Sequence, residues 1–455
     1  MDIIGHPALR LFIRLTLVGL LLLSAVPPAG AVGMIRDTEV ENSIRAFATP
    51  LLEAAGLDPA ALEVHIVNDK SLNAFVAGGQ KLFVHTGLLL RADHAGQVIG
   101  VIAHEIGHIS GGHLARLQDA FESASNQAII ATVLGAAATI ATGRGDVGSA
   151  VIMGGNEMAM RNLLSFSRTQ ESSADQAGVT YLMKTQQSPR GIMEFMEIIG
   201  QQELWMVERQ DPYVRTHPIS QERISFLREQ LAKSPYADAP LRPEYALMFR
   251  RLKAKLFAFT EPQIRTLARY KESDTSFEAR MARSIAYYRK ADLANALPLI
   301  DGLIQENPND AYLYELKGQF LFENGRIPEA KDTLIQAARL MPDAPLILIS
   351  LAQAQIESND DALLKDAIHS LNQALAKEKD NALGWRLLSV AHGRLGNQGM
   401  TAYAMAEFAL LTGKLAEAQY HADHADKLLP KGSPAWLAIQ DIKTDIERQK
   451  AKKKK

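Results

Sequence analysis

One short motif inside an apolar segment restricts the folds open to this 455-residue chain more than any other feature. Positions 104 to 108 read His-Glu-Ile-Gly-His, and they follow the uninterrupted apolar run 98–103. Apolar residues recur at helical spacing across this stretch, which predicts a helix that begins at Asp93 as its N-cap. A buried histidine or glutamate without a partner costs several kcal/mol. We therefore expect this core helix to carry a site that binds all three polar side chains.

The spacing within the motif indicates the chemistry of that site. His104 and His108 lie four residues apart and share a helix face, while Glu105 lies one step around the helix. Neutral imidazoles bind zinc, and an open fourth position lets zinc lower the pKa of a bound water to about 7. The chain has no cysteine and 12 histidines, so its metal ligands must be His, Asp or Glu. The motif predicts one Zn²⁺ per chain, with Glu105 as the base that deprotonates water.

Two residues compete for the role of third metal ligand. His113 follows the motif, but it comes one residue before the position at which metalloproteases with three ligating histidines carry the third; this chain has Leu114 there. Glu171 and Asp175 lie at i and i+4 on a second predicted helix, so Glu171 can bind the ion while Asp175 orients a ligating histidine through its free ring nitrogen. We favour Glu171 as the ligand. His113 is then expected to be a surface or structural histidine at the end of the first helix.

Together the two motifs resemble those of the gluzincin peptidases of the HtpX and CAAX prenyl protease type, in which HExxH is followed by an ExxxD helix. The segments 73–79 and 86–88 are similar to the stretch before the metal helix in that family. The resemblance spans roughly residues 36–230 and implies a zinc metalloendopeptidase. It also implies a catalytic role for His217, either as a switch that approaches the zinc or as a group that stabilises the transition state. The implied partners are outer-membrane β-barrel proteins and their assembly machinery.

Apart from the resemblance, the residues themselves leave the role of His217 open. Pro218 favours extended backbone at His217, and an imidazole 46 residues after Glu171 can reach the same cleft; a plain loop histidine is the alternative. If His217 occupies the fourth zinc position it excludes water. That outcome would favour a different function, a chaperone or adaptor whose C-terminal half binds clients while the protease is held inactive.

The C-terminal half has the period of a helical repeat. Ala296 and Ala330 lie 34 residues apart, and so do Pro308 and Pro342, with each alanine 12 residues before its proline. This pattern predicts tetratricopeptide repeats, whose stacked helix pairs bury a common core and present a concave surface. Farther on, the corresponding positions lie 51 residues apart, between residues 367 and 418, so the repeat count is four or five. We expect this solenoid to select protein substrates or assembly machinery.

The N-terminus has the order of a secretory signal peptide: Arg10 and Arg14, an apolar run over 15–26, then Ala29-Gly30-Ala31. The run of 12 residues is shorter than the roughly 20 needed to span a bilayer. We expect cleavage after Ala31 and export to the periplasm, with an uncleaved anchor as the alternative. The predicted organisation is a signal peptide (1–31), an α+β zincin-like metallopeptidase domain, mostly helical with a small sheet (32–233), a linker or helical connection (234–279), an all-α tetratricopeptide-repeat solenoid (280–446) and a basic tail (447–455).

Composition limits the remaining possibilities. Apolar residues make up 47% of the chain and charged residues 22%, which is typical of globular domains. The net charge of −2 supplies no basic field for binding nucleic acid. The apolar segment 127–155 predicts a buried helical hairpin or, alternatively, a mobile lid or a loop that contacts a membrane or partner. With the basic tail, it allows peripheral contact with a membrane.

Overall fold

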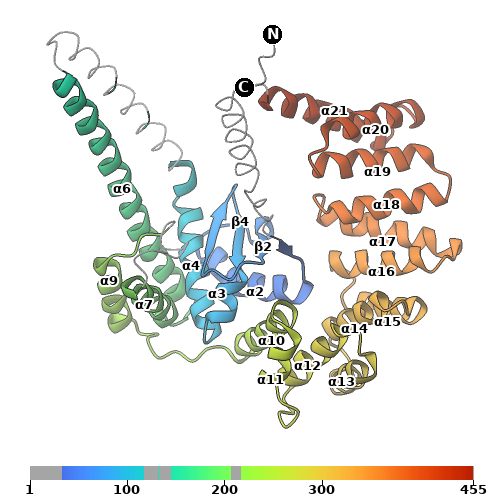
Figure 1. Ribbon diagram of the computed structural model, residues 1–455, viewed down its shortest axis with the longest axis horizontal. Coiled ribbons are helices and arrows are strands. Elements are labelled where there is room, and N and C mark those ends of the chain that lie inside the picture. Colours follow the sequence, from blue (N-terminus) through green and yellow to red (C-terminus); the bar gives the residue numbers. More distant parts are fainter. Residues whose placement is uncertain (1–32, 117–124, 126–131, 133–144, 206–216, 454–455) are drawn as a thin grey trace, which may run out of the picture.

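A computed structural model of the chain describes residues 33–116, 125, 132, 145–205 and 217–453 (Figure 1). The predicted signal peptide and most of the apolar segment 127–155 lie outside the described residues; positions 145–155 form the start of the helix over 145–184. Within the described part, the chain is mostly helical with one small sheet, as the sequence predicted.

The elements of the first half are β1 (Met34–Ile35), α2 (Thr38–Ala54), the 3₁₀ helix η2 (Pro59–Ala61), β2 (Glu63–Val67), β3 (Ala74–Ala77), β4 (Lys81–His85), α3 (Thr86–Arg91), α4 (Ala95–Ser110), α6 (Gly145–Lys184), α7 (Arg190–Trp205) and α9 (Gln221–Lys233). The elements of the second half are α10 (Pro243–Thr260), α11 (Gln263–Arg269), α12 (Phe277–Tyr288), α13 (Leu293–Glu306), α14 (Ala311–Glu323), α15 (Ile327–Leu340), α16 (Pro345–Glu357), η3 (Asp361–Leu363), α17 (Leu364–Lys377), α18 (Ala382–Arg394), α19 (Gln398–Leu411), α20 (Leu415–Leu428) and α21 (Pro434–Lys453).

The four strands form one sheet in the order β1-β2-β4-β3. β2 and β4 are parallel, whereas β1 and β3 pair antiparallel with their neighbours. Alternate residues of the strands face the core, and on the opposite face Phe83 stacks between His65 and Phe75, with ring centroids 4.7 and 4.8 Å away. The turn between β3 and β4 uses Gly78 and Gly79 at φ 53° and 95°, a conformation that favours glycine. The strand order makes β3 an edge strand, and it packs beside α4.

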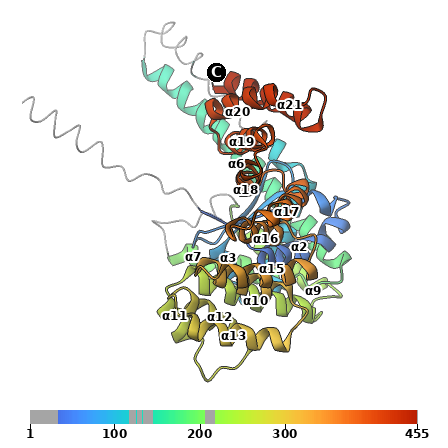
Figure 2. The same ribbon diagram turned by 90° about the vertical axis from the view of Figure 1, so that its right-hand side faces the viewer.

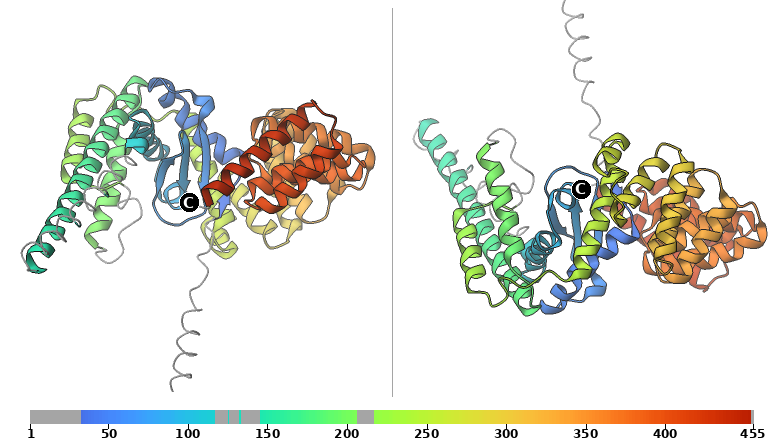
Figure 3. Two further views of the ribbon diagram at one scale, coloured as in Figure 1. Left: turned by 90° about the horizontal axis from the view of Figure 1, so that it is seen from above. Right: turned by 90° about the horizontal axis from the view of Figure 1, so that it is seen from below.

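The first core joins the sheet to α2, α4, α6 and α7. Its buried side chains include Phe47 of α2, Val98 of α4 and Phe195 of α7. Figures 1 and 3 show the sheet between the layer of α4, α6 and α7 and the stack of later helices. The long helix α6 projects well beyond the other elements of this unit (Figure 1). α4 thus crosses the centre of the unit, so its polar residues are shielded from water.

The start of α4 differs from the sequence prediction. His94 is the N-cap residue, in extended backbone and without a side-chain cap, and the helix begins at Ala95. Asp93 does not cap the helix; its backbone N–H donates to Oε1 of Gln97 at 2.9 Å. The side chain of Gln97, in the first turn, thus binds the backbone just before the helix, and the N-cap residue makes no side-chain cap in place of the predicted aspartate.

Within the second half, helices α12 to α21 form a stack of ten antiparallel helices beside the first unit (Figures 1 and 2). Close packing explains the small residues of the repeat pattern: a Cβ on Gly318 of α14 would lie 2.6 Å from Leu334 of α15. Ala330 and Ala337 are fully buried. The 51-residue interval contains α18 and α19 between α17 and α20, so three helix steps separate the matching alanines where a regular repeat has two. α21 continues to Lys453, through most of the predicted basic tail.

Helix α10 belongs to two cores. Phe249 and Leu252 pack in the core of the first unit, whereas Ala254 and Ala258 pack with α12 and α13. Lys255 of the same helix is only 3% exposed and forms ion pairs with Asp37 at 2.8 Å and with Glu39 of α2 at 3.3 Å. The segment between the two halves is therefore packed and charge-paired against the first unit.

Candidate active site

The predicted metal residues of α4 are buried in the first unit. His104 and Glu105 are fully buried and His108 is 8% exposed. Glycines allow the helix that carries the second motif to lie unusually close: a Cβ on Gly107 would lie 2.6 Å from the backbone oxygen of Ala174 in α6. A Cβ on Gly178 would lie 3.1 Å from the backbone of α4. These two glycines bring α6 and its carboxylates against the histidines of α4.

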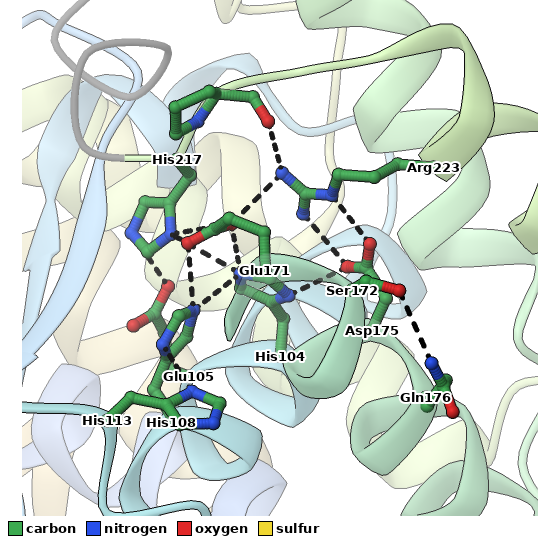
Figure 4. Close-up of polar contacts among 11 residues, drawn as sticks. His104, Glu105, His108, His113, Glu171, Ser172, Asp175, Gln176, His217 and Arg223 are labelled. Carbon is green, nitrogen blue, oxygen red and sulfur yellow. Dashed lines mark hydrogen bonds and ion pairs between the residues drawn. The ribbon is translucent and has the colours of Figure 1, made fainter. Parts of the chain in front are cut away.

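Four side chains from three segments converge on one point (Figure 4). One ligand atom from each of His104, His108, Glu171 and His217 lies within 4.8 Å of all the others. Nε2 of His104 is 3.1 Å from Nε2 of His108, 3.3 Å from Nδ1 of His217 and 3.3 Å from Oε2 of Glu171. His108 Nε2 lies 3.3 Å from the other oxygen of Glu171. The predicted third ligand and the predicted catalytic histidine both reach the HExxH motif.

The spacing of these atoms suits a metal ion. Tetrahedral zinc with bonds of about 2.0–2.1 Å separates its ligand atoms by about 3.3 Å. His104 lies 3.1 to 3.3 Å from each of the other three ligand groups, and Glu171 lies 3.2 to 3.3 Å from His217 and His108. Three neutral nitrogens and one carboxylate oxygen are also a donor set that zinc accepts. In both chemistry and distance, the residues fit a four-coordinate metal.

A cluster of charged side chains lies next to the four candidate ligands. Oδ1 of Asp175 lies 2.9 Å from Nδ1 of His104, the ring nitrogen that faces away from the other ligands. Arg223 of α9 donates to both oxygens of Asp175, at 2.6 and 2.9 Å, and lies 3.0 Å from Oε2 of Glu171. The same guanidinium donates to the backbone oxygen of Pro218 at 2.7 Å, next to His217. Arg223 thus links both carboxylates of α6 to the segment that carries His217.

Residues 35–231 match Peptidase family M48. This part of the chain is an M48 metallopeptidase domain. The beta-barrel assembly-enhancing protease of Escherichia coli (strain K12) is 25% identical over 429 residues, which is 92% of this chain and 85% of that protein. The putative beta-barrel assembly-enhancing protease of Vibrio cholerae is 24% identical over 88% of this chain and 83% of its own length.

A second kind of relative matches the M48 domain alone. The mitochondrial metalloendopeptidase OMA1 of Schizosaccharomyces pombe is 27% identical over 184 residues, covering 40% of this chain and 51% of that protein. The M48 domain and the metalloendopeptidases among the relatives support a zinc metalloprotease. Within the described ranges, no helix of the structure has the length and apolarity that a membrane crossing requires.

Charges in the M48 site are set by opposing effects of burial and ion pairing. Burial works against a proton on His104, but the carboxylates of Asp175 and Glu171 outweigh it and raise the pKa of His104 to about 10. Burial with weaker compensation lowers the pKa of His108 to about 3. For Glu171, burial is outweighed by His217 and by hydrogen bonds from the other histidines, which hold its pKa well below the ordinary value. A bound metal cation would replace the proton that the carboxylates favour on His104.

Glu105 lies in a different environment from the carboxylates of α6. The imidazole of His217 lies beside it, with Nε2 at 3.5 Å from Oε1 of Glu105. Burial raises the pKa of Glu105 above its usual value. A higher pKa makes Glu105 a stronger base, because the pKa then lies closer to the pH at which a hydrolase works.

The structure adds one residue to the M48 site and decides between two expectations for another. Arg223 was not predicted, although two buried carboxylates one turn apart require a cation nearby. The available signal was an arginine at the start of the helix that follows His217-Pro218. His113 was expected to be a surface or structural histidine. It is 4% exposed, which excludes the surface position, and its ring contacts His108 without entering the ligand group.

Proposed function

We propose that this protein is an exported zinc endopeptidase that hydrolyses polypeptides of the periplasm. The observation that carries the proposal is the convergence of His104, His108, Glu171 and His217 within 4.8 Å of one another, with Glu105 beside them. We assign His104, His108 and Glu171 as the zinc ligands and Asp175 as the residue that orients His104. The order of the N-terminal residues supports export, with cleavage after Ala31.

The proposed reaction divides the work among a few side chains. Zinc, when bound, polarises a carbonyl and makes water a nucleophile near neutral pH. Glu105 accepts the proton of the attacking water and passes it to the nitrogen of the leaving amine. Asp175 accepts a hydrogen bond from Nδ1 of His104 and keeps Nε2 turned toward the ligand group. Arg223 balances the two buried carboxylates, so that neither is an unpaired buried charge.

The substrate is proposed to bind in extended form along β3. This strand is at the edge of the sheet and packs beside the metal helix α4. An edge strand offers main-chain hydrogen bonds that recognise a polypeptide independently of its side chains. That mode of binding suits an endopeptidase that acts on unfolded or unassembled protein.

His217 is proposed to hold the fourth position at rest. Its Nδ1 lies 3.3 Å from Nε2 of His104 and 3.2 Å from both oxygens of Glu171, so it occupies the space that water would need. An occupied fourth position excludes water. This geometry favours the second candidate function, a chaperone or adaptor whose protease is normally inactive. In both functions, withdrawal of His217 turns the protease on.

The stacked helices are proposed to be tetratricopeptide repeats that choose the clients. The 34-residue spacing, the buried alanines and the contact between Gly318 and Leu334 support this assignment. The names of the full-length relatives refer to β-barrel assembly. We propose that the clients are outer-membrane β-barrel proteins or their assembly machinery.

Metal analysis tests the proposed enzyme. The wild-type protein is expected to contain one zinc per chain, and Glu171→Ala is expected to lose most of it. Glu272→Ala, which removes an exposed carboxylate from the turn before α12, is the matched control and should keep its zinc. A normal zinc content in Glu171→Ala would refute the ligand assignment.

A further inference from the structure

The two ring nitrogens of His108 face different partners. Nε2 faces His104 and Glu171 in the ligand group. Nδ1 lies 3.0 Å from Nδ1 of His113, and Figure 4 shows the two rings side by side. The planes of these rings are inclined by 82°, with centroids 4.9 Å apart. One nitrogen of this pair must donate and the other must accept.

Two glycines at the C-terminus of α4 make room for the His113 ring beside His108. Gly111 caps the C-terminus of α4, and a Cβ there would lie 2.3 Å from Nε2 of His113. Gly112 follows at φ 62°, in the left-handed region that favours glycine. The backbone oxygen of His113 accepts a hydrogen bond from Nε2 of Gln170 at 3.2 Å, one residue before Glu171. The two glycines and the hydrogen bond from Gln170 of α6 thus hold the His113 ring against His108.

The contact with His113 can fix the tautomer of His108. A histidine that binds metal through Nε2 must carry its proton on Nδ1, and a hydrogen-bond acceptor at Nδ1 fixes that state and the angle of the ring. His113 is 4% exposed, and its Nδ1 faces Nδ1 of His108, so a proton placed on the His108 nitrogen by metal binding at Nε2 points at an available acceptor. His104 has a carboxylate in the corresponding place, Asp175 at 2.9 Å. The two motif histidines are thus supported by different chemical groups.

We propose that His113 is the positioning residue of His108: it accepts the Nδ1–H of His108 and so keeps Nε2 directed at the metal. This inference rests on the proposed zinc site. The neutral acceptor adds no negative charge behind the site, where Asp175 and Glu171 already require Arg223. It therefore orients a ligand without a second buried carboxylate that would need its own cation.

Zinc affinity tests the proposal on the full-length chain. Outer-shell partners of metal ligands typically change metal affinity by about 10- to 100-fold, so His113→Ala is expected to weaken zinc binding by that factor in competition with a chelator. His113→Gln keeps an acceptor oxygen and should recover most of the affinity. His392→Ala, which removes another buried histidine far along the chain, should leave the affinity unchanged.

A spectroscopic measurement needs no variant and covers the case in which His113→Ala does not fold. Long-range ¹H–¹⁵N spectra of zinc-loaded wild-type protein with labelled histidine should show His108 protonated at Nδ1 and metal-bound at Nε2, with His113 neutral. Wild-type affinity in folded His113→Ala, or a metal bond at Nδ1 of His108, would overturn the inference alone. Wild-type protein that binds no zinc would overturn the proposed function and this inference with it.

Discussion

Ending the chain at Lys233, the last residue of α9, is expected to prevent the peptidase unit from folding, whereas ending it at Thr260 is not. The difference between the two proteins is α10, whose side chains Tyr245, Phe249, Leu252 and Leu256 are between 0% and 5% exposed and belong to the same core as α4. Full burial of a large apolar side chain contributes about 1.5–3 kcal/mol. The four together contribute roughly 6–12 kcal/mol, an upper estimate. The entire stability of a domain is about 5–15 kcal/mol.

Buried charge strengthens the same expectation. Glu39 is 4% exposed, and its partners Arg251 and Lys255 both lie on α10. Removing one partner of a buried ion pair costs about 3–5 kcal/mol, because an uncompensated charge remains. A protein that ends at Thr260 keeps both cations. It loses the contacts of α10 with the later helices and polar contacts of the first unit such as Thr38 with Glu315 and Asn42 with Tyr312.

Urea unfolding and zinc content of the two shortened proteins provide the assay. The protein ending at Thr260 should unfold cooperatively and bind one zinc, while the protein ending at Lys233 should show neither property. In the full chain, Leu252→Ala should cost about 2–5 kcal/mol, whereas Leu247→Ala, at a position 43% exposed on the same helix, should cost much less. Cooperative unfolding and full zinc content in the protein ending at Lys233 would refute the assignment of α10 to the peptidase core.

Three further predictions concern single side chains. Glu105→Gln should keep its zinc but cleave an unfolded protein about 10²- to 10⁴-fold more slowly, because the amide cannot accept a proton; cleavage at the wild-type rate would contradict the mechanism. His217→Ala should retain zinc and raise proteolysis or self-cleavage, measured by gel assay, and a fall in activity would instead indicate that His217 stabilises the transition state. Burial raises the pKa of Glu315 from 4.5 to about 7, so the folded state binds more protons than the unfolded state between these values and loses stability as the pH rises through them. Glu315→Gln should remove that loss, on the order of 3 kcal/mol, and identical pH profiles of urea unfolding for wild type and variant would refute it.

The local parts of this structure could be predicted from the sequence because they depend on neighbours along the chain. Residues at i and i+4 share a helix face, and this rule alone pairs His104 with His108 and Glu171 with Asp175. The resemblance of segments 73–79 and 86–88 to the stretch before the metal helix, with the prediction of a small sheet, anticipated the strands ahead of α4. The 34-residue period likewise anticipated the stack of helix pairs, since each pair repeats the same local contacts.

Tertiary structure decided how those parts meet, because residues far apart in the chain make contact only when close packing permits it. Gly107 and Gly178 let α6 approach α4, and that approach brings Glu171 to within 3.3 Å of His104, 67 residues earlier in the chain. Arg223 neutralises the carboxylates from a third segment. Two buried carboxylates indicate that a cation is near, but the sequence around Asp175 does not identify one 48 residues away. The packing of α10 in two cores has the same origin: Pro-rich composition marks a change of segment, but only the folded chain shows which surfaces that segment covers.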